Sequence, residues 1–350
     1  MSEKNNFPCV GLLANPSSGQ DMRRLVSSAE TVTNLAKVNQ IARVLAGLRA
    51  IGPCKVLFMP ERLGLVQSAF NSLQSLVDRG VPQNGLSVEP LEFVPQGTPQ
   101  DTLAATRIMC ESGCSLLITF GGDGTNRLVA MESNKVPLLP ISAGTNNIFS
   151  FSCEGTQAGL AAGIFLKILH SGTDLPSGIS INKLAQQHKL LLAETASWSE
   201  SALIDLAISR QSSVGGRAIW DADCLQAVFV TQCAPGASGL CGIPGAIFDI
   251  PPHAPHGAAA FLGNRFSVQA VLTAGRVQNV GLESVERLNM NQLRTVKVSE
   301  GTVLADGERI RELRNETVQI TLHPEGPWVL DFKATLAVGL QHGFFQLGPE

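Results

Sequence analysis

The chain has 350 residues, of which 44% are hydrophobic and 16% are charged, and its formal net charge is −3. This composition is typical of a globular protein and argues against long disordered regions. The sequence has no Lys/Arg run suited to a nucleic-acid backbone and no apolar stretch of the ~20 residues that cross a bilayer. The eight cysteines are scattered without a Cys-x-x-Cys pair, which argues against a structural zinc site. The first residues do not resemble a signal peptide, so we expect a cytoplasmic protein with no nucleic-acid partner and no membrane span.

The first half of the chain alternates strand and helix patterns. In chain order, these patterns predict a strand at 8–14, a helix at 35–48, a strand at 54–59, a helix at 65–78, a strand at 91–94, a helix at 99–112, a strand at 116–120, a helix at 126–132 and a strand at 137–141. Continuous apolar strands separated by helices are typical of a parallel sheet covered on both faces. We therefore predict a Rossmann-like α/β domain over residues 1–150.

The second half begins with a predicted helix at 155–170 and then changes character. Short apolar or alternating runs follow between Gly/Pro turns, at 189–193, 201–209, 227–231, 265–272, 295–298, 318–322 and 329–332. Runs of this length and spacing are typical of an antiparallel, sandwich-like or layered β domain. We expect this β-rich domain to span residues 151–333, with the boundary between residues 151 and 180.

The strongest motif directly follows the apolar strand 116–120 and reads Gly121-Gly122-Asp123-Gly124-Thr125-Asn126. Three glycines in four residues let the backbone approach a ligand closely, and the N–H groups of the following helix favour an anion. A carboxylate in a phosphate cradle is repulsive unless it holds Mg²⁺ or accepts a proton from an attacking hydroxyl. The alternative is a tight turn in which Asp123 serves as a helix cap.

Two further loops follow apolar strands. One is Ser142-Ala143-Gly144-Thr145-Asn146-Asn147, and the other is Asn15-Pro16-Ser17-Ser18-Gly19. Each loop alone is compatible with ordinary turn chemistry. Together with the 121–125 loop they predict a crevice at the carboxyl ends of neighbouring strands, which is the usual ligand position in open α/β sheets.

This combination of motifs resembles the NAD kinase and diacylglycerol kinase superfamily, and the resemblance covers most of the chain. It implies that Asp123 is the catalytic base, while the loop residues contact nucleotide phosphates. The implied nucleotide-binding residues are Asn15, Gly121, Gly122, Gly124, Thr125, Asn126, Gly144, Thr145, Asn146 and Asn147. It also implies that the chain end, about 334–350, packs back on the first domain.

The second half is more similar to the NAD kinase branch, with two departures from its pattern. Asp205 stands at the acidic position of the segment that holds the NAD ribose, but Ile204 replaces the expected Asn. Gly236 and Ser238 fit a later loop of that branch, in which Leu240 replaces a Tyr. The resemblance therefore implies that Asp205, Gly236 and Ser238 bind the acceptor. An apolar Ile cannot make the hydrogen bonds of an Asn, so the acceptor itself stays open.

The opening stretch is most similar to the acetoin catabolism protein X family of NAD-kinase-like proteins, through residues 11–16, 21–26 and 37–48. The resemblance implies phosphoryl transfer from ATP to the 2′-hydroxyl of the NAD adenosine ribose, with Mg²⁺ carried by substrate phosphates, in a homodimer or higher homo-oligomer. Two alternatives stay open. One is a lipid or small-polyol kinase, and the other is a non-catalytic protein that binds NAD(H) or a related nucleotide.

Overall fold

The computed structural model describes residues 7–19, 32–77, 85–143, 147–170, 181–211 and 222–346. Its elements follow in chain order as β1 (Cys9–Ala14), α1 (Asn34–Ile51), β2 (Cys54–Phe58), α2 (Leu65–Val77), β3 (Leu86–Pro90), α3 (Pro99–Glu111), β4 (Leu116–Gly121), α4 (Asp123–Glu132), β5 (Leu138–Ser142), α5 (Gly155–His170), α6 (Ile181–Leu184) and β6 (Ala185–Gln187). They continue as β7 (Leu190–Glu194), β8 (Ser199–Ala202), β9 (Asp205–Ser209), η2 (Ala222–Cys224), β10 (Leu225–Val230), α7 (Gly242–Gly245), β11 (His256–Thr273), β12 (Arg276–Asn289), β13 (Arg294–Ala305), β14 (Glu308–His323), β15 (Trp328–Leu330) and α8 (Phe332–Gln341). Among these described residues, no helix has the length and apolar character to cross a membrane.

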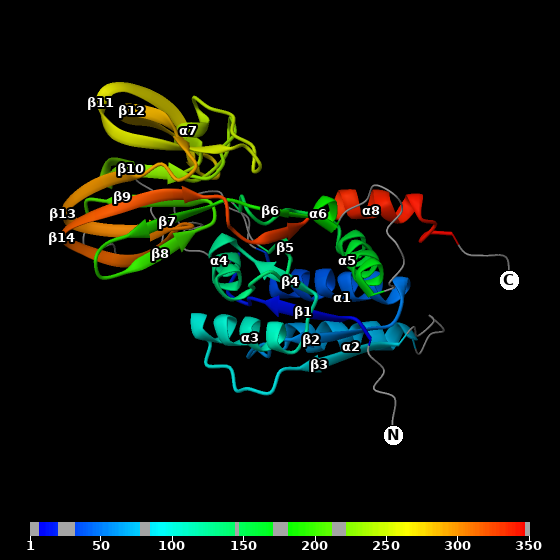
Figure 1. Ribbon diagram of the computed structural model, residues 1–350. Helices are drawn as coiled ribbons and strands as arrows, with labels where there is room; N and C mark the ends of the chain where they lie inside the picture. Colours follow the sequence, from blue (N-terminus) through cyan, green and yellow to red (C-terminus); the bar gives the residue numbers. More distant parts are fainter. Residues whose placement is uncertain are drawn as a thin grey trace.

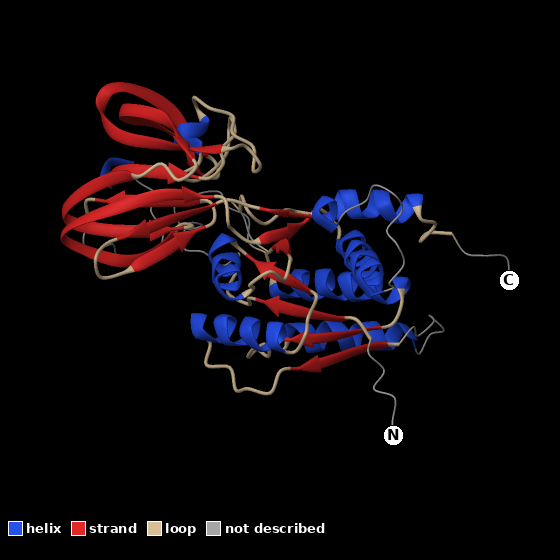
Figure 2. Cartoon of the chain, in the orientation of Figure 1, coloured by secondary structure: helices blue, strands red, loops and turns tan. Residues whose placement is uncertain are grey.

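The first sheet has the strand order β3-β2-β1-β4-β5-β15-β6, and every pair in it is parallel except β15 with β6. Alternate residues of β1 face opposite sides: Val10 and Leu12 join a core with α1, α2 and α5, whereas Leu13 joins a core with α3 and α4. Helices therefore cover both faces of the sheet, which confirms the predicted α/β domain (Figures 1 and 2).

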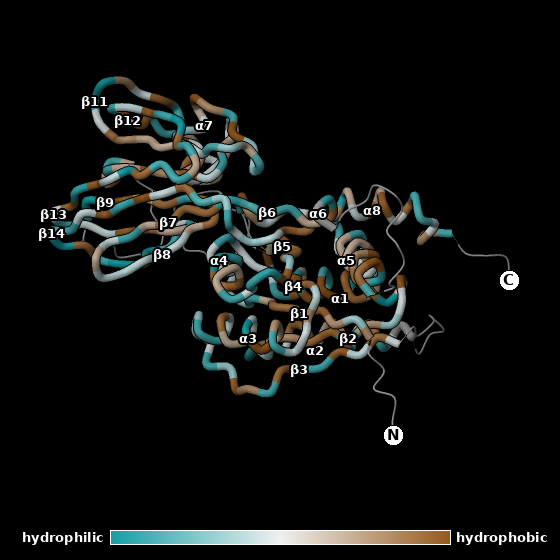
Figure 3. The backbone as a smooth tube through the Cα atoms, in the orientation of Figure 1, coloured by the Kyte–Doolittle hydropathy of each residue, from teal (hydrophilic) through white to brown (hydrophobic). Residues whose placement is uncertain are grey.

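The helix pair α1 and α5 packs unusually closely, through small residues on both helices. Gly155, Gly159 and Gly163 follow one another at four-residue intervals on α5 and face α1. A Cβ built on Gly159 would lie 2.1 Å from the carbonyl oxygen of Val44 and 3.0 Å from the Cα of Gly47. This close contact buries an α5 whose residues are predominantly apolar (Figure 3).

The second sheet is entirely antiparallel, with the order β12-β11-β10-β9-β13-β14-β7-β8. One core cluster contains residues from all eight of these strands, so the sheet curls around that cluster (Figure 1). This confirms the β-rich second domain, although one curled, continuous sheet replaces the layered sandwich that the sequence favoured.

The boundary between the two halves differs from the expected one at residue 150. Helix α5 packs on α1, and strands β6 and β15 extend the first sheet, so the described segments 155–170, 181–187 and 328–330 belong with the α/β half. Helix α8 packs in the same core, through Phe332, Leu336 and Val338. The sequence assigned 155–170, 181–187 and 328–330 to the β domain because their own patterns do not show which sheet they join, whereas it expected the chain end from about 334 to pack on the first domain.

Three element assignments also need correction. The expected strand at 91–94 is a loop in which Val94 is 84% exposed, and the edge strand is β3 instead, where Leu86 and Val88 alternate with polar residues. The expected strand 201–209 is two strands, β8 and β9, because the N–H groups of Leu203 and Ile204 bond to a side chain instead of a neighbouring strand. Helix α4 begins at Asp123, three residues before the predicted start.

Candidate active site

Three loops meet where the central strands of the first sheet end. Strands β1, β4 and β5 are neighbours in the order β1-β4-β5 and run parallel, so the residues after each strand lie along one edge. Asn15 follows β1, Gly122 follows β4 and Ala143 follows β5. Gly144, Thr145 and Asn146 lie outside the described residues, whereas Asn147 is described, and its amide nitrogen donates to Ser142 Oγ at 2.8 Å.

The three glycines of the 121–124 turn each allow a different group to come close. A Cβ on Gly121 would lie 2.7 Å from Thr125 Cβ, and one on Gly122 would lie 3.1 Å from Asn147 Oδ1. A Cβ on Gly124 would lie 2.8 Å from Glu308 Oε1. These glycines are therefore needed for close approach and not for a left-handed backbone, since none of them has a positive φ.

Asp123 is the first residue of α4, and its carboxylate crosses to the loop after β5. Its Oδ2 accepts from Ile148 N at 2.8 Å, and its Oδ1 accepts from Phe149 N at 3.1 Å and Ser150 N at 3.3 Å. The carboxylate is therefore held in one orientation and ties two of the three loops together. The residue before the helix, Gly122, has no capping side chain, so Asp123 does not play the capping role considered from the sequence.

Asn15 and Thr125 connect the first loop to the glycine turn. The Asn15 amide nitrogen donates to Thr125 Oγ1 at 2.8 Å, and Asn15 Oδ1 accepts from Ser17 N at 2.9 Å. This geometry orients the Thr125 hydroxyl, whose oxygen is used as an acceptor and whose hydrogen must point elsewhere.

The placement of Asn126 corrects its predicted contact with the nucleotide. Its side chain is fully buried, with Oδ1 accepting from Thr119 Oγ1 at 2.6 Å and Nδ2 donating to Gly122 O at 3.0 Å. Both ends of the amide thus stabilise the β4-α4 junction from inside, and no side-chain atom faces the edge of the sheet.

The second domain contributes the turn between β13 and β14, Asp306-Gly307-Glu308. Asp306 and Gly307 have φ angles of 50° and 74°, so the turn is tight and left-handed. It places the carboxylate of Glu308 against Gly124, at the N-terminal end of α4, where a negative charge interacts favourably with the helix dipole. The same position suits an anionic ligand.

Arg127 of α4 faces the second domain, one helical turn after Asp123. Its guanidinium is 3.9 Å from Asp306 Oδ2 and 4.0 Å from carboxylate oxygens of Glu200 and Glu308. The side chain is buried, and its Nε has no hydrogen-bond partner among the described residues. Arg127 therefore offsets the charge of three carboxylates that approach from β8, β14 and the turn between β13 and β14.

Asp306 organises the segment that the sequence assigned to the acceptor. Its carboxylate accepts from Leu203 N at 2.9 Å, Ile204 N at 2.7 Å and Asp205 N at 3.3 Å, while Gly307 N donates to Asp205 Oδ1 at 3.3 Å. Burial raises the pKa of Asp306 to about 8, and the nearby charges of Asp205 and Asp123 add to this rise. Asp123 and Asp205, from different domains, thus both act on the pKa of Asp306.

The remaining acceptor positions differ in their placement. The side chains of Ile204 and Leu240 are buried in the core, so neither offers a polar group to a ligand. Gly236 lies on an exposed part of the loop after β10, with a φ of 76°, and Ser238 forms a bridge with Val271 of β11. The bridge joins Ser238 to β11, and within the described part of the chain neither residue has a hydrogen bond to Asp123.

Sequence reasoning missed Lys37 and Arg127, although the position of each on its predicted helix could have indicated it. Lys37 lies on the same helix face as Ile41, Val44 and Leu48, which are all buried, and is itself fully buried. A lysine within an apolar stripe has an unusual environment. Arg127 follows Asp123 by four residues, which places both on one face of a helix.

The described residues do not form a metal site of their own. No three His, Cys, Asp or Glu side chains in the described part of the chain are grouped so that they could hold an ion. A cage for Mg²⁺ does not fit this arrangement, and we assign no residue and no catalytic step to the metal.

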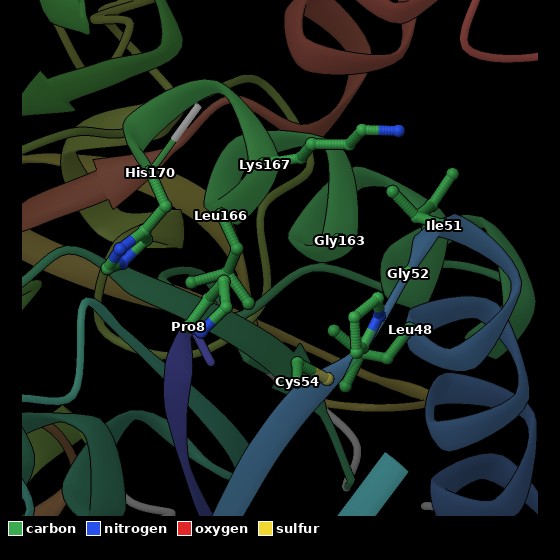
Figure 4. A pocket seen from close by; sticks show the side chains of 10 residues that line it. Pro8, Leu48, Ile51, Gly52, Cys54, Gly163, Leu166, Lys167 and His170 are labelled. Atoms are coloured by element: carbon green, nitrogen blue, oxygen red, sulfur yellow. The ribbon is translucent and has the colours of Figure 1, made fainter. Parts of the chain in front are cut away.

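A separate cavity of about 250 Å³ lies at the opposite end of the first sheet, where β1 and β2 begin (Figure 4). Pro8, Leu48, Cys54 and Leu166 give it a mainly apolar lining. Its two basic residues have other partners, since His170 Nε2 is 3.2 Å from Ser115 Oγ and Lys167 Nζ lies over the Phe344 ring. We therefore place the candidate active site at the 121–125 turn and not in this cavity.

Comparison with known proteins agrees with this division of the chain. Residues 10–164 match the ATP-NAD kinase N-terminal domain, and residues 189–325 match the acetoin catabolism protein X C-terminal domain. The acetoin catabolism protein X of Cupriavidus necator is 32% identical over 352 aligned positions, which cover 98% of this chain and 95% of that protein.

Proposed function

The chain belongs to the acetoin catabolism protein X family, and from this premise we propose that it transfers a phosphoryl group from ATP to NAD. The acceptor atom in this proposal is the 2′-hydroxyl of the adenosine ribose, and the product is NADP. A kinase-like role follows from the NAD kinase domain, whereas the choice of NAD is our inference. The observation that carries it is the position of Asp123 on the glycine turn, at the N-terminal end of α4, where Glu308 of the second domain also lies.

In this proposal the glycine turn and Asn15-Thr125 bind the donor phosphates, with Mg²⁺ accompanying the ATP. The N-terminal end of α4 supplies partial positive charge to the phosphates. Asp123 orients the acceptor hydroxyl and accepts its proton, in the role of the base of a phosphotransferase. Three N–H donors fix its carboxylate, so little reorganisation is needed during the reaction. Asp205, Gly236 and Ser238 remain our candidates for holding the acceptor.

We further propose that the protein acts in the cytoplasm as a homodimer or higher homo-oligomer, and that it takes part in acetoin catabolism. The last point rests on the name of the Cupriavidus necator relative. That name describes a pathway and does not identify a reaction.

Two observations favour a second candidate, a protein that binds NAD(H) without turning it over. The carboxylate of Asp123 is engaged by a loop of its own chain, and Glu308 lies where a donor phosphate would approach α4. In both cases a group that would act on the substrate is already occupied or blocked by the protein itself, as in a site that does not turn over.

The buried Ile204 and Leu240 provide no polar contact for a ribose, so a lipid or polyol acceptor is a further alternative.

The test incubates the protein with ATP, NAD and Mg²⁺ and detects NADP⁺ with an NADP-specific dehydrogenase. We expect wild type to form NADP⁺ and Asp123→Asn to lose a factor of about 10² to 10⁴ in kcat, the range of general-base catalysis. Because the Asp123 carboxylate accepts three N–H groups, the variant is also expected to loosen the 148–150 loop, and thermal unfolding should be measured beside activity.

The affinities for ATP and NAD separate the two effects. Retained binding with lost turnover assigns the base to Asp123, whereas near-normal turnover contradicts that assignment. If wild type binds NAD but consumes no ATP with NAD, lipid or polyol acceptors, the binding role replaces the kinase.

A further inference from the structure

Lys37 is a charged side chain with no exposure to solvent, beneath the loop that follows β1. Its Nζ is 2.6 Å from Ser18 O, 2.7 Å from Pro16 O, 3.2 Å from Asn15 O and 3.2 Å from Asn34 Oδ1. An ammonium has three N–H groups, so four oxygens within this distance share all of its donors. The Lys37 ammonium thus holds three carbonyl oxygens of the 15–18 turn close together around its Nζ atom.

A buried charge is an expensive way to fix a turn. Transfer of an ammonium out of water costs several kcal/mol after relaxation, and the carbonyl dipoles offset this only where the geometry is good. Burial lowers the pKa of Lys37 to about 8, which shows that the environment opposes the charge, while the nearby Glu61 acts in the opposite direction. An amide donor in the same place would avoid this cost.

The turn that Lys37 holds is connected to the glycine loop by two further contacts. Asn15, whose carbonyl accepts from Lys37, donates through its side chain to Thr125 Oγ1 at 2.8 Å. Ser18, whose carbonyl also accepts from Lys37, donates through its hydroxyl to Ala143 O at 3.2 Å. Lys37 therefore contacts one of the three loops directly and the other two through Asn15 and Ser18, although its side chain is not exposed to solvent.

We propose that Lys37 is a positioning residue for the donor phosphates, which acts through Asn15 on the Thr125 hydroxyl and places a positive charge beneath the phosphate site. The proposal rests on the proposed function in one respect, namely that the 15–18 and 121–125 loops bind the phosphates of ATP. It predicts that loss of the charge weakens binding of the phosphates and leaves binding of the nucleoside unchanged.

Lys189 supplies a matched control in the second domain. It is also buried, burial also lowers its pKa to about 8, and its Nζ also donates to loop carbonyls, at 2.8 Å to His256 O and 3.4 Å to Pro251 O. The loop that it holds, 251–256, is outside the three loops of the phosphate site. Lys37→Met and Lys189→Met therefore remove the same chemistry from two different places.

The experiment measures Kd for ATP and for adenosine by calorimetry in wild type and both variants, together with KM for ATP and NAD. We expect Lys37→Met to raise Kd and KM for ATP about tenfold or more, which corresponds to about 1.4 kcal/mol. Adenosine affinity and KM for NAD should stay within about twofold. Lys189→Met should lower the unfolding temperature without changing ATP affinity.

An ATP affinity of Lys37→Met equal to that of wild type overturns the proposal, as does an equal loss for ATP and adenosine. If Lys37→Met does not fold, the same affinities are measured for Lys37→Gln, because its amide still donates to the carbonyls but carries no charge. These measurements are independent of turnover. ATP binding that depends on Lys37 in a protein that phosphorylates no acceptor supports the positioning role and rejects only the proposed reaction.

Discussion

Several charged side chains around the candidate site have exchanged water for protein partners, and each does so differently. Lys37 is surrounded by carbonyl oxygens, Asp306 by backbone N–H groups, and Arg127 by carboxylates at 3.9–4.0 Å. Charges in such surroundings are costly unless they are paired and hydrogen-bonded. Their concentration around the 121–125 turn is typical of functional sites.

The raised pKa of Asp306 leads to a prediction about pH. Folding raises this pKa from 3.8 to about 8, so between these values the folded state binds more protons than the unfolded state. The contribution of Asp306 to the free energy of unfolding is present below the unfolded pKa and is lost as pH rises through the folded one. The stability of wild type minus that of Asp306→Asn should therefore decrease from pH 4 to pH 8.

Urea unfolding of both proteins across this range measures the difference. His188, whose pKa burial lowers to about 3, has the opposite effect below its ordinary value of 6.5, but it is present in both proteins and cancels. A difference that stays constant with pH would show that the folded-state pKa of Asp306 is not raised.

At the scale of elements, the position of α5 depends on its glycines. The sequence predicted this helix within its observed bounds, Gly155–His170, and its content of Ala and Gly was apparent. Glycine usually destabilises a helix interior by roughly 1 kcal/mol relative to alanine. Here the absence of a side chain allows α1 and α5 to approach until backbone atoms meet, and this contact helps to place the 15–18 turn, since Lys37 belongs to α1.

We expect Gly159→Ala to destabilise the protein by about 1–3 kcal/mol, the usual cost of overpacking a core. Its Cβ would lie 2.1 Å from Val44 O. The nearest atoms, from Val44 and Gly47, all belong to the backbone and cannot turn away, so the helices would have to separate. Gly52→Ala, at the end of α1, is the control, because no atom lies within 4 Å of its Cβ. Equal thermal midpoints for the two variants would contradict the close packing.

At the scale of the whole molecule, the chain passes from the α/β half to the curled β sheet and returns through β15. This return places residues at both ends of the β domain next to the first sheet (Figure 1). The contacts that complete the candidate site are then made by Arg127 with Glu200, Asp306 and Glu308. The charge cluster beside the proposed catalytic residue thus adds to an apolar core that contains residues of both halves.

Removal of Arg127 should therefore have a large effect. Arg127→Met removes the cation beside the buried Asp306, the partly buried Glu200 and the half-exposed Glu308, and we expect a loss of about 3 kcal/mol in the free energy of unfolding. Adding Asp306→Asn should recover part of this loss, because the two changes are coupled. Arg107→Met removes an exposed pair with Glu132 and should cause a much smaller change. Urea unfolding tests all three, and additive effects of the first two would contradict the coupling.

The sequence by itself determined the local features of this protein. A buried strand followed by Gly121-Gly122-Asp123-Gly124-Thr125 predicts a turn at the end of a strand, and the periodicity of 155–170 predicts a helix, because both depend on neighbouring residues. The same patterns placed Asn15, Thr125 and Asn147 at one edge of a parallel sheet, where the structure also has them.

Only the tertiary structure decided which distant segments meet. It showed that Asn126 faces the interior, that Lys37 holds the 15–18 turn, that β6 and β15 extend the first sheet, and that α5 packs in the core beside that sheet. It also brought Asp306 and Glu308 to α4, about 180 residues away in the chain. Side-chain patterns encode the secondary structure of a segment, whereas its partner depends on packing and charge summed over the whole chain.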